Sequence, residues 1–157
     1  MQESLLYPFL QNILLALFCG GVIGLERSFR NKAAGFRTMM FICMGTAIFV
    51  DIALVLSRRA VNYNPGIDRI VGSIVTGIGF LGAGSIFRSS EKNAVEGLTT
   101  AATIWYVAGL GLLIGFRLYV LAVPATALAL LILVFFGRLE RYILRLINEV
   151  PLKFKKK

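Results

Sequence analysis

Charged residues are absent from long stretches of this 157-residue chain, and the spacing of the charges constrains its fold more than any other feature. Five stretches are uncharged apart from Asp51: 4–25, 38–57, 70–87, 97–116 and 118–137. A helix needs about 17–25 mostly apolar residues to cross a bilayer, and each stretch fits that length. The sequence therefore predicts five transmembrane helices, near residues 5–25, 38–57, 70–87, 97–115 and 118–137.

The fourth and fifth of these spans are separated only by Gly115, Phe116 and Arg117. So short a link predicts a tight antiparallel hairpin, and the alternative is one long broken helix. The first span has Glu3 as its only flanking charge and no basic segment before it, so we expect it to be retained rather than removed as a signal peptide.

Composition supports a membrane protein. Hydrophobic residues make up 57% of the chain, charged residues only 16%, and the mean hydropathy is +0.78. Soluble domains carry about 45–50% apolar and about 25% charged residues. We expect an all-α polytopic membrane protein with two parts: a five-helix transmembrane domain over residues 1–137 and a basic amphipathic cytoplasmic tail over 138–157. Apolar residues recur every three or four positions in that tail, which predicts an interfacial helix on the membrane surface.

The basic residues divide unequally between the two ends of the predicted spans. With the amino terminus outside, thirteen of the seventeen Lys and Arg residues fall on the inner side. The outer side holds four: Arg58, Arg59, Arg69 and Arg117. By the positive-inside rule, this predicts an outside amino terminus and an inside carboxy terminus. The net charge of +9 then indicates contact with anionic lipids at the cytoplasmic face, and we expect no nucleic-acid partner.

Glycines gather in the third span, where Gly77, Gly79 and Gly82 match the G-x-G-x-x-G pattern of dinucleotide-binding loops. That pattern requires a preceding strand, which this span lacks. In a membrane helix, glycine instead allows close backbone approach. With Gly72 and Gly84, these residues predict a central third helix that several others contact; a break or a backbone-lined cavity is the alternative. Two further small-residue pairs, Gly20/Gly24 and Gly111/Gly115, predict a homodimer.

Acidic residues near the outer ends of spans two and three offer a cation site. Asp51 lies inside span two and Asp68 begins span three. Two carboxylates at this level are a candidate site for hydrated Mg²⁺; the alternatives are wetting by the headgroups for Asp51, helix capping for Asp68, and pairing with arginines such as Arg69.

At the inner ends, an ion pair of Glu26 with Arg37 or Arg88 is one interpretation, and snorkelling toward lipid phosphates is the other. Cys19 and Cys43 lie inside spans and are expected to be buried and free. The chain has no histidine, no nucleophile beside a base and no paired carboxylates in a wet cleft, so we expect no enzymatic activity.

Together these residues resemble the transmembrane domain of the MgtC/SapB family of bacterial membrane proteins. The resemblance covers about residues 10–135 and is carried by blocks in the family's order: Gly24–Arg27, Ala34–Thr38, Asp68–Ile70, Gly77–Gly84, Gly97–Ala102 and Trp105. It points to Glu26, Arg27, Arg37 and Arg69 as functional or structural charges, and to Gly97, Thr99 and Thr100 as packing residues. Glu96 stands where the family often has a basic residue. We expect the transmembrane domain only, without the soluble carboxy-terminal domain of long members.

The resemblance implies a protein of the bacterial inner membrane that is tied to magnesium limitation and, in pathogens, to virulence. It implies no cofactor other than Mg²⁺. Two mechanisms stay open: regulation of other membrane machinery, such as an ATP synthase or a P-type ATPase, and transport of Mg²⁺ or another cation through an oligomer. The sequence favours the regulator, because five spans with no internal repeat differ from the usual plan of alternating-access transporters.

Overall fold

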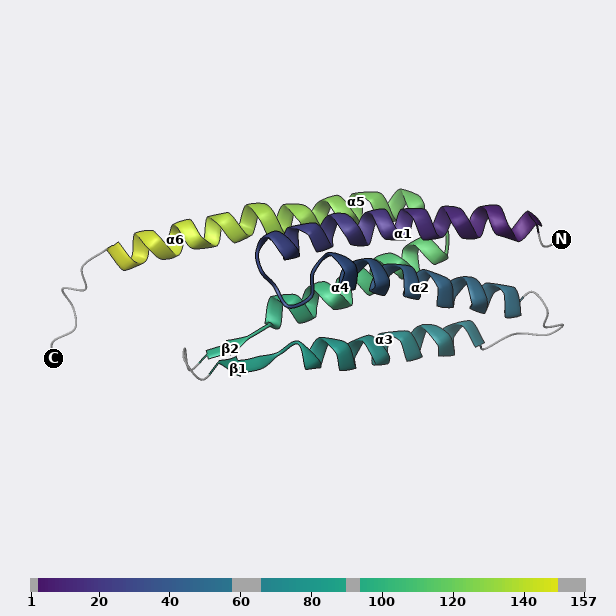
Figure 1. The fold of residues 1–157 in the computed structure, drawn as a ribbon, viewed down its shortest axis with the longest axis horizontal. Helices are drawn as coiled ribbons and strands as arrows, with labels where there is room; N and C mark the ends of the chain where they lie inside the picture. Colours follow the sequence, from purple (N-terminus) through teal and green to yellow (C-terminus); the bar gives the residue numbers. More distant parts are fainter. Residues whose placement is uncertain (1–2, 58–65, 90–93, 150–157) are drawn as a thin grey trace.

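The computed structural model describes residues 3–57, 66–89 and 94–149, which form an elongated bundle of helices (Figure 1). Five helices are long and apolar enough to cross a membrane, which confirms the predicted number of spans. Four of them are α1 (Glu3–Phe29), α2 (Phe36–Ser57), α3 (Gly66–Gly84) and α4 (Leu98–Gly115). In a hydrocarbon environment the backbone N–H and C=O groups must bond within the segment, so each uncharged stretch forms a helix. The chain is an all-α polytopic membrane protein.

The fifth span is one long helix with an irregular turn in it. It consists of α5 (Tyr119–Leu131), a π-helical turn η1 (Ile132–Phe136) and α6 (Gly137–Glu149). The helix α6 is amphipathic, as expected, but it continues in the direction of α5 and projects past the end of α1 (Figure 1). Backbone bonding continues through η1 without a break, so α6 is continuous with α5. The interfacial position of this basic segment stays a prediction.

The connections between spans are short where the structure describes them. The helix α4 ends at Gly115 and α5 starts at Tyr119, with Arg117 in the left-handed region at φ 61°. This confirms the tight turn. Between α3 and α4 lie two strands that pair antiparallel, β1 (Phe87–Ser89) and β2 (Ala94–Glu96), which the sequence did not predict. Gly97 follows at φ 94°, where a side chain would collide with the carbonyl oxygen of Ser85.

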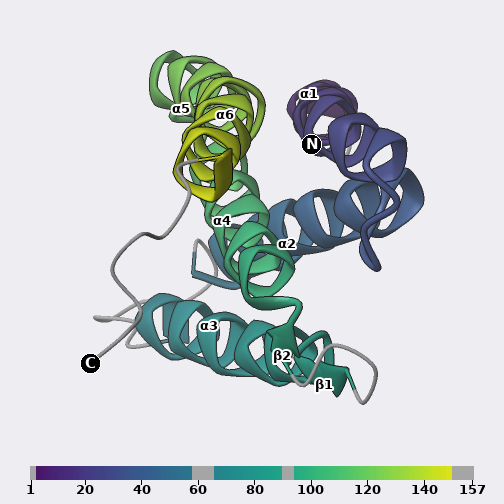
Figure 2. The same cartoon turned by 90° about the vertical axis from the view of Figure 1, so that its left-hand side faces the viewer.

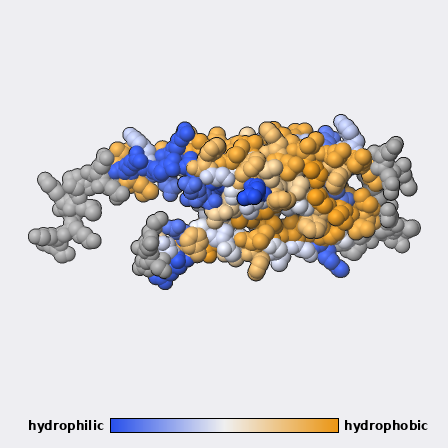
Figure 3. All heavy atoms as spheres, in the orientation of Figure 1, coloured by the Kyte–Doolittle hydropathy of each residue, from blue (hydrophilic) through white to orange (hydrophobic). Residues whose placement is uncertain are grey.

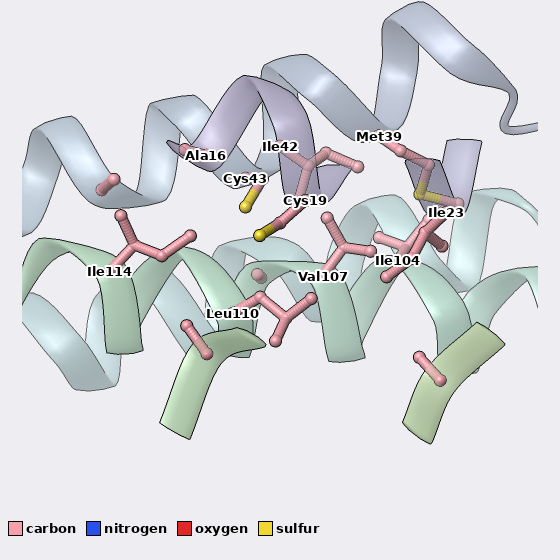
Figure 4. Packing of buried hydrophobic residues seen from close by; sticks show 14 of the residues in the cluster. Ala16, Cys19, Ile23, Met39, Ile42, Cys43, Ile104, Val107, Leu110 and Ile114 are labelled. Carbon is pink, nitrogen blue, oxygen red and sulfur yellow. The ribbon is translucent and has the colours of Figure 1, made fainter. Parts of the chain in front are cut away.

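The core of the bundle lies between α1, α2 and α4. Its largest fully buried side chains meet there (Figure 4) and include Ile23, Met39, Val107, Leu110 and Ile114. Cys19 and Cys43 belong to the same cluster and are free thiols, as expected. The helix α5 covers the core from outside through the small residues Ala122 and Ala129. The end-on view shows α2 and α4 in the middle, with α1 and α5 on one side and α3 on the other (Figure 2).

The prediction of a central third helix is wrong for a single copy of the chain. Only Gly82 of α3 is buried, and it meets Ala101 of α4 at ordinary contact distance. A side chain added at Gly72, Gly77, Gly79 or Gly84 would find no atom within 4 Å. Glycine permits close packing but does not enforce it, so the glycines of α3 are compatible with an open face.

Close helix packing occurs instead at the other two glycine pairs. A Cβ on Gly20 would lie 2.6 Å from the Met39 carbonyl oxygen, and one on Gly24 would lie 2.7 Å from the Phe36 Cα. On α4, a Cβ at Gly111 would collide with the Cys43 carbonyl oxygen, and one at Gly115 would lie 2.5 Å from the Val50 Cβ. Both pairs are therefore used inside one chain, to bring α1 and α4 against α2. They no longer argue for a homodimer.

Candidate functional site

A cluster of three polar side chains joins three helices near the carboxy-terminal end of α2. Asn12 of α1 is fully buried and donates from Nδ2 to both carboxylate oxygens of Asp51, at 2.8 and 3.1 Å. The Tyr119 hydroxyl, at the start of α5, donates to Asn12 Oδ1 at 2.6 Å. We call Asn12, Asp51 and Tyr119 the Asn12 cluster. The Asn12 side chain thus uses both ends of its amide: the nitrogen donates to Asp51, and the oxygen accepts from Tyr119.

Beside the Asn12 cluster lies a cavity of about 400 Å³. Asp51 and Arg117 supply its charged lining, and the rest of the wall is apolar, with Leu5, Phe9, Ile52 and Leu56 among its residues. An ionisable side chain inside a membrane span is costly unless it is paired or wetted. Asp51 is here both exposed to the cavity and hydrogen-bonded to the amide of Asn12.

The second predicted acid, Asp68, lies elsewhere. It is exposed in the first turn of α3, where a carboxylate interacts favourably with the helix dipole. Its neighbour Arg69 is also exposed. Asp51 is hydrogen-bonded to Asn12, and among the described residues no group of three or more His, Cys, Asp or Glu side chains is placed to hold a metal ion. A magnesium site formed by Asp51 and Asp68 stays a prediction.

At the opposite end of the bundle, the charges of α1 pair with one another. Arg27 and Arg30 both form ion pairs with Glu26, and Arg27 Nε donates to Glu26 Oε2. Arg27 is only 3% exposed, so it is a buried charge that depends on this partner. The expected ion pair of Glu26 with Arg37 or Arg88 is wrong: Glu26 pairs instead with Arg27 of its own helix and with Arg30, which follows α1 by one residue. Arg30 reaches Glu26 because residues four apart on a helical path share one face.

The remaining predicted residues of this end lie around the starts of α2 and α4. Arg37 is exposed in the first turn of α2, and Glu96 is half-buried at the end of β2. After Gly97, Thr100 is buried and Thr99 is exposed. Sequence reasoning overlooked Ser28, whose Oγ accepts a hydrogen bond of 2.8 Å from the Phe36 backbone N–H and so fixes the start of α2 against α1.

Asn12 and Tyr119 were also overlooked, although both carry a signal. An amide inside an apolar span is rare enough to mark a buried hydrogen bond, just as a carboxylate is. The pattern of charged residues identifies Asp51 but gives no sign of its neutral partners Asn12 and Tyr119. Only their shared hydrogen bonds reveal that residues 12, 51 and 119 form one group.

Comparison with known proteins places the chain among related membrane proteins. The model of the MgtC family matches residues 13–142. "Putative magnesium transporter YhiD" of Escherichia coli K12 is 40% identical over 146 residues, which is 90% of this chain and 65% of that protein. Protein MgtC of Salmonella typhimurium LT2 is 38% identical over 151 residues, 96% of this chain and 60% of that protein.

Protein SrpB of Synechococcus elongatus is 41% identical over 139 residues, covering 82% of this chain and 75% of that protein. The chain thus spans less than two thirds of the length of the YhiD and MgtC proteins that it matches. No solved structure matches the chain.

Proposed function

The chain belongs to the MgtC family of bacterial multi-pass membrane proteins, and we propose that it serves magnesium homeostasis as a non-enzymatic regulator or interaction partner of other membrane machinery. The link to magnesium rests on the relative whose printed name is a magnesium transporter. The regulatory role rests on one observation in this structure, the apolar core that separates its two polar ends.

Within a single copy of the chain, the described residues of this core form no polar path for an ion from one end of the bundle to the other. Between the Asn12 cluster and the ion pairs of Glu26, the interior is filled by side chains that include Cys19, Val107 and Leu110, each at most 2% exposed. Buried threonine hydroxyls are present, but Thr103 and Thr126 donate to carbonyls of their own helices. Mg²⁺ gives up its water reluctantly and needs oxygen ligands, so this interior is a poor route for it.

A surface for a partner helix lies between α2 and α3. These helices diverge to form a groove of about 610 Å³, lined by apolar side chains such as Phe41, Phe49 and Leu81, and by two glycines. No atom lies within 4 Å of a Cβ placed on Gly45 or Gly77. Small residues let a second transmembrane helix approach closely in lipid. The proposed occupant is a helix of a membrane machine such as an ATP synthase or a P-type ATPase, and a homodimer is the competing use.

Cation transport is the second candidate function, and Asp51 favours it. Its carboxylate lines the 400 Å³ cavity inside a span, the arrangement expected for an ion or proton site. In this case the path would run between copies of the chain in an oligomer.

Two leucine substitutions on α3 test the regulatory proposal. Gly77 lines the groove, whereas Gly79 does not, and both have open space around them. Gly77→Leu should therefore fold normally but fail to support growth of a low-magnesium host that depends on this protein, because it fills the groove. Gly79→Leu should support growth. A photo-crosslinker at exposed Phe49 should lose its adduct only in Gly77→Leu, and the adduct mass separates a second copy from another protein.

Two outcomes would overturn the regulatory proposal. One is normal growth and crosslinking with Gly77→Leu. The other is Mg²⁺ uptake into proteoliposomes of the purified chain above that of empty liposomes and lost in Asp51→Asn, which would establish the transporter instead.

A further inference from the structure

A second and larger cavity lies at the end of the bundle where α1 finishes. It measures about 940 Å³ and is bounded by the last turn of α1, the link after it, Thr99 of α4, and the π turn with α6. We call it the η1 cavity. Ligand sites commonly measure about 300–1,000 Å³, so its size is that of a binding site. Nothing in the proposed function uses it.

The lining of the η1 cavity is divided into a charged and an apolar zone. Four basic side chains, Arg27, Arg30, Lys32 and Arg141, face it together with one acid, Glu140. The apolar zone includes Ile132, Leu133 and Phe136 of η1, which belong to the fifth span. Hydrophilic residues gather at this end of the molecule, next to the apolar band that covers the spans (Figure 3). The cavity therefore crosses the level where the membrane-spanning surface gives way to polar surface.

Among the described residues, the ion pairs of this zone leave guanidinium donors over. Glu26 pairs with Arg27 and Arg30, but one carboxylate has two oxygens, whereas each guanidinium has five N–H donors. Arg30 also lies beside Gly137 at the start of α6, where a Cβ would be 3.7 Å from its Nη1. The excess of positive charge favours an anion, and guanidinium groups bind phosphate oxygens well.

The π turn supplies the apolar wall. The five residues Ile132–Phe136 form η1, and three of them line the cavity. A π turn accommodates about one extra residue, which rotates the following helix by about 100° relative to an unbroken α-helix. This rotation helps to set which face of α6 borders the cavity. Arg141 lines the cavity, and Arg145, one turn further along the same face of α6, lies outside the lining. Such turns are rare and often occur at functional sites.

We propose that the η1 cavity binds an anionic phospholipid of the surrounding membrane. Its phosphate lies among Arg30, Lys32 and Arg141, and the upper part of its chains lies against Ile132 and Phe136. A soluble phosphate would leave the apolar zone unfilled, and a zwitterionic lipid would leave the positive charge uncompensated. The two zones together therefore select a lipid with a net negative headgroup. The bound lipid would bridge α1 and α6, which otherwise projects alone beyond the bundle (Figure 1).

Native mass spectrometry of the chain in mild detergent tests the site, with phosphatidylglycerol and phosphatidylcholine of identical chains as probes. We expect phosphatidylglycerol to be retained about five- to tenfold better, because each basic group near an anionic headgroup contributes about 1 kcal/mol and the zwitterionic headgroup has no net charge. Arg141→Gln and Lys32→Gln should each reduce its retention by about fivefold. Arg145→Gln is the matched control, since it removes the same charge from the same helix outside the cavity.

Three results would overturn the lipid site. Equal retention of the two lipids would remove the selectivity for a negative headgroup. Equal losses in Arg141→Gln and Arg145→Gln would indicate diffuse attraction to the basic surface. Displacement of the lipid by soluble glycerol phosphate at similar concentration would show that the acyl chains of the lipid contribute nothing to binding. Because Arg141 and Lys32 are exposed, both variants should melt like the parent, and the melting curves check this.

Discussion

At the scale of single residues, Asn12 determines how an ionisable group is tolerated inside a span. Its amide donates to Asp51 and accepts from Tyr119, so it is the one member of the Asn12 cluster that contacts both others. A buried polar group that loses its partner keeps the full cost of leaving water. The packing of α1, α2 and α5 at this end thus depends on the neutral side chain of Asn12 as well as on the charge of Asp51.

Replacing Asn12 should therefore destabilise the protein more than its size suggests. Asn12→Ala leaves both Asp51 and Tyr119 without this partner, and we expect it to cost about 1–3 kcal/mol of unfolding free energy. In Asp51→Ala, the cost of losing Asn12 should be smaller, because the carboxylate is already absent. Thermal unfolding of the two single variants and the double variant in detergent measures this coupling. Additive effects would show that the hydrogen bonds between Asn12 and Asp51 contribute nothing.

At the scale of helices, α2 is the element against which α1, α3 and α4 pack. The helix α1 approaches it through Gly20 and Gly24, and α4 approaches it through Gly111 and Gly115. In lipid there is no hydrophobic drive between helices, so contact depends on dispersion and on small residues that bring backbones close. Four glycines of α3 have open space around them and do not serve this purpose in one chain: Gly72, Gly77, Gly79 and Gly84.

Two alanine substitutions distinguish a closely packed glycine, Gly111, from an open one, Gly79. In Gly111→Ala the added methyl group collides with the Cys43 carbonyl oxygen, a backbone atom that cannot move alone, and we expect a loss of about 1–3 kcal/mol. In Gly79→Ala the methyl group meets nothing within 4 Å, so the better helix propensity of alanine should leave stability unchanged or raise it by up to about 1 kcal/mol. Melting in detergent compares them, and an equal loss in both variants would refute the packing role of Gly111.

At the scale of the whole molecule, the two ends of the bundle differ in charge. One end holds the Asn12 cluster, and the other holds the ion pairs of Glu26, the strands, and the basic helix α6 (Figure 1). An odd number of spans predicts termini on opposite sides of the membrane, and one of the two orientations then puts thirteen of the seventeen basic residues on the inner side. By the positive-inside rule, we predict that this side faces the cytoplasm.

Reporter fusions at each terminus test this orientation. A reporter that is active only outside the cytoplasm should work at the amino terminus and fail at the carboxy terminus, and a cytoplasmic reporter should do the reverse. The expected cause is the thirteen-to-four division of Lys and Arg. Activity of one reporter at both termini would contradict the odd number of spans, and exchanged activities would contradict the orientation.

The sequence by itself determined the five spans, the tight turn before Tyr119 and the burial of Cys19 and Cys43. The reason is that a bilayer sets the length of an apolar helix, and length and hydropathy are properties of one segment alone. Only the tertiary structure decided that Gly20 and Gly111 pack while Gly79 stays open, that Glu26 pairs with its near neighbours in the sequence, and that Asn12 meets Asp51. Those contacts depend on how each helix is rotated about its axis toward its neighbours, and glycine or a charge is compatible with more than one rotation.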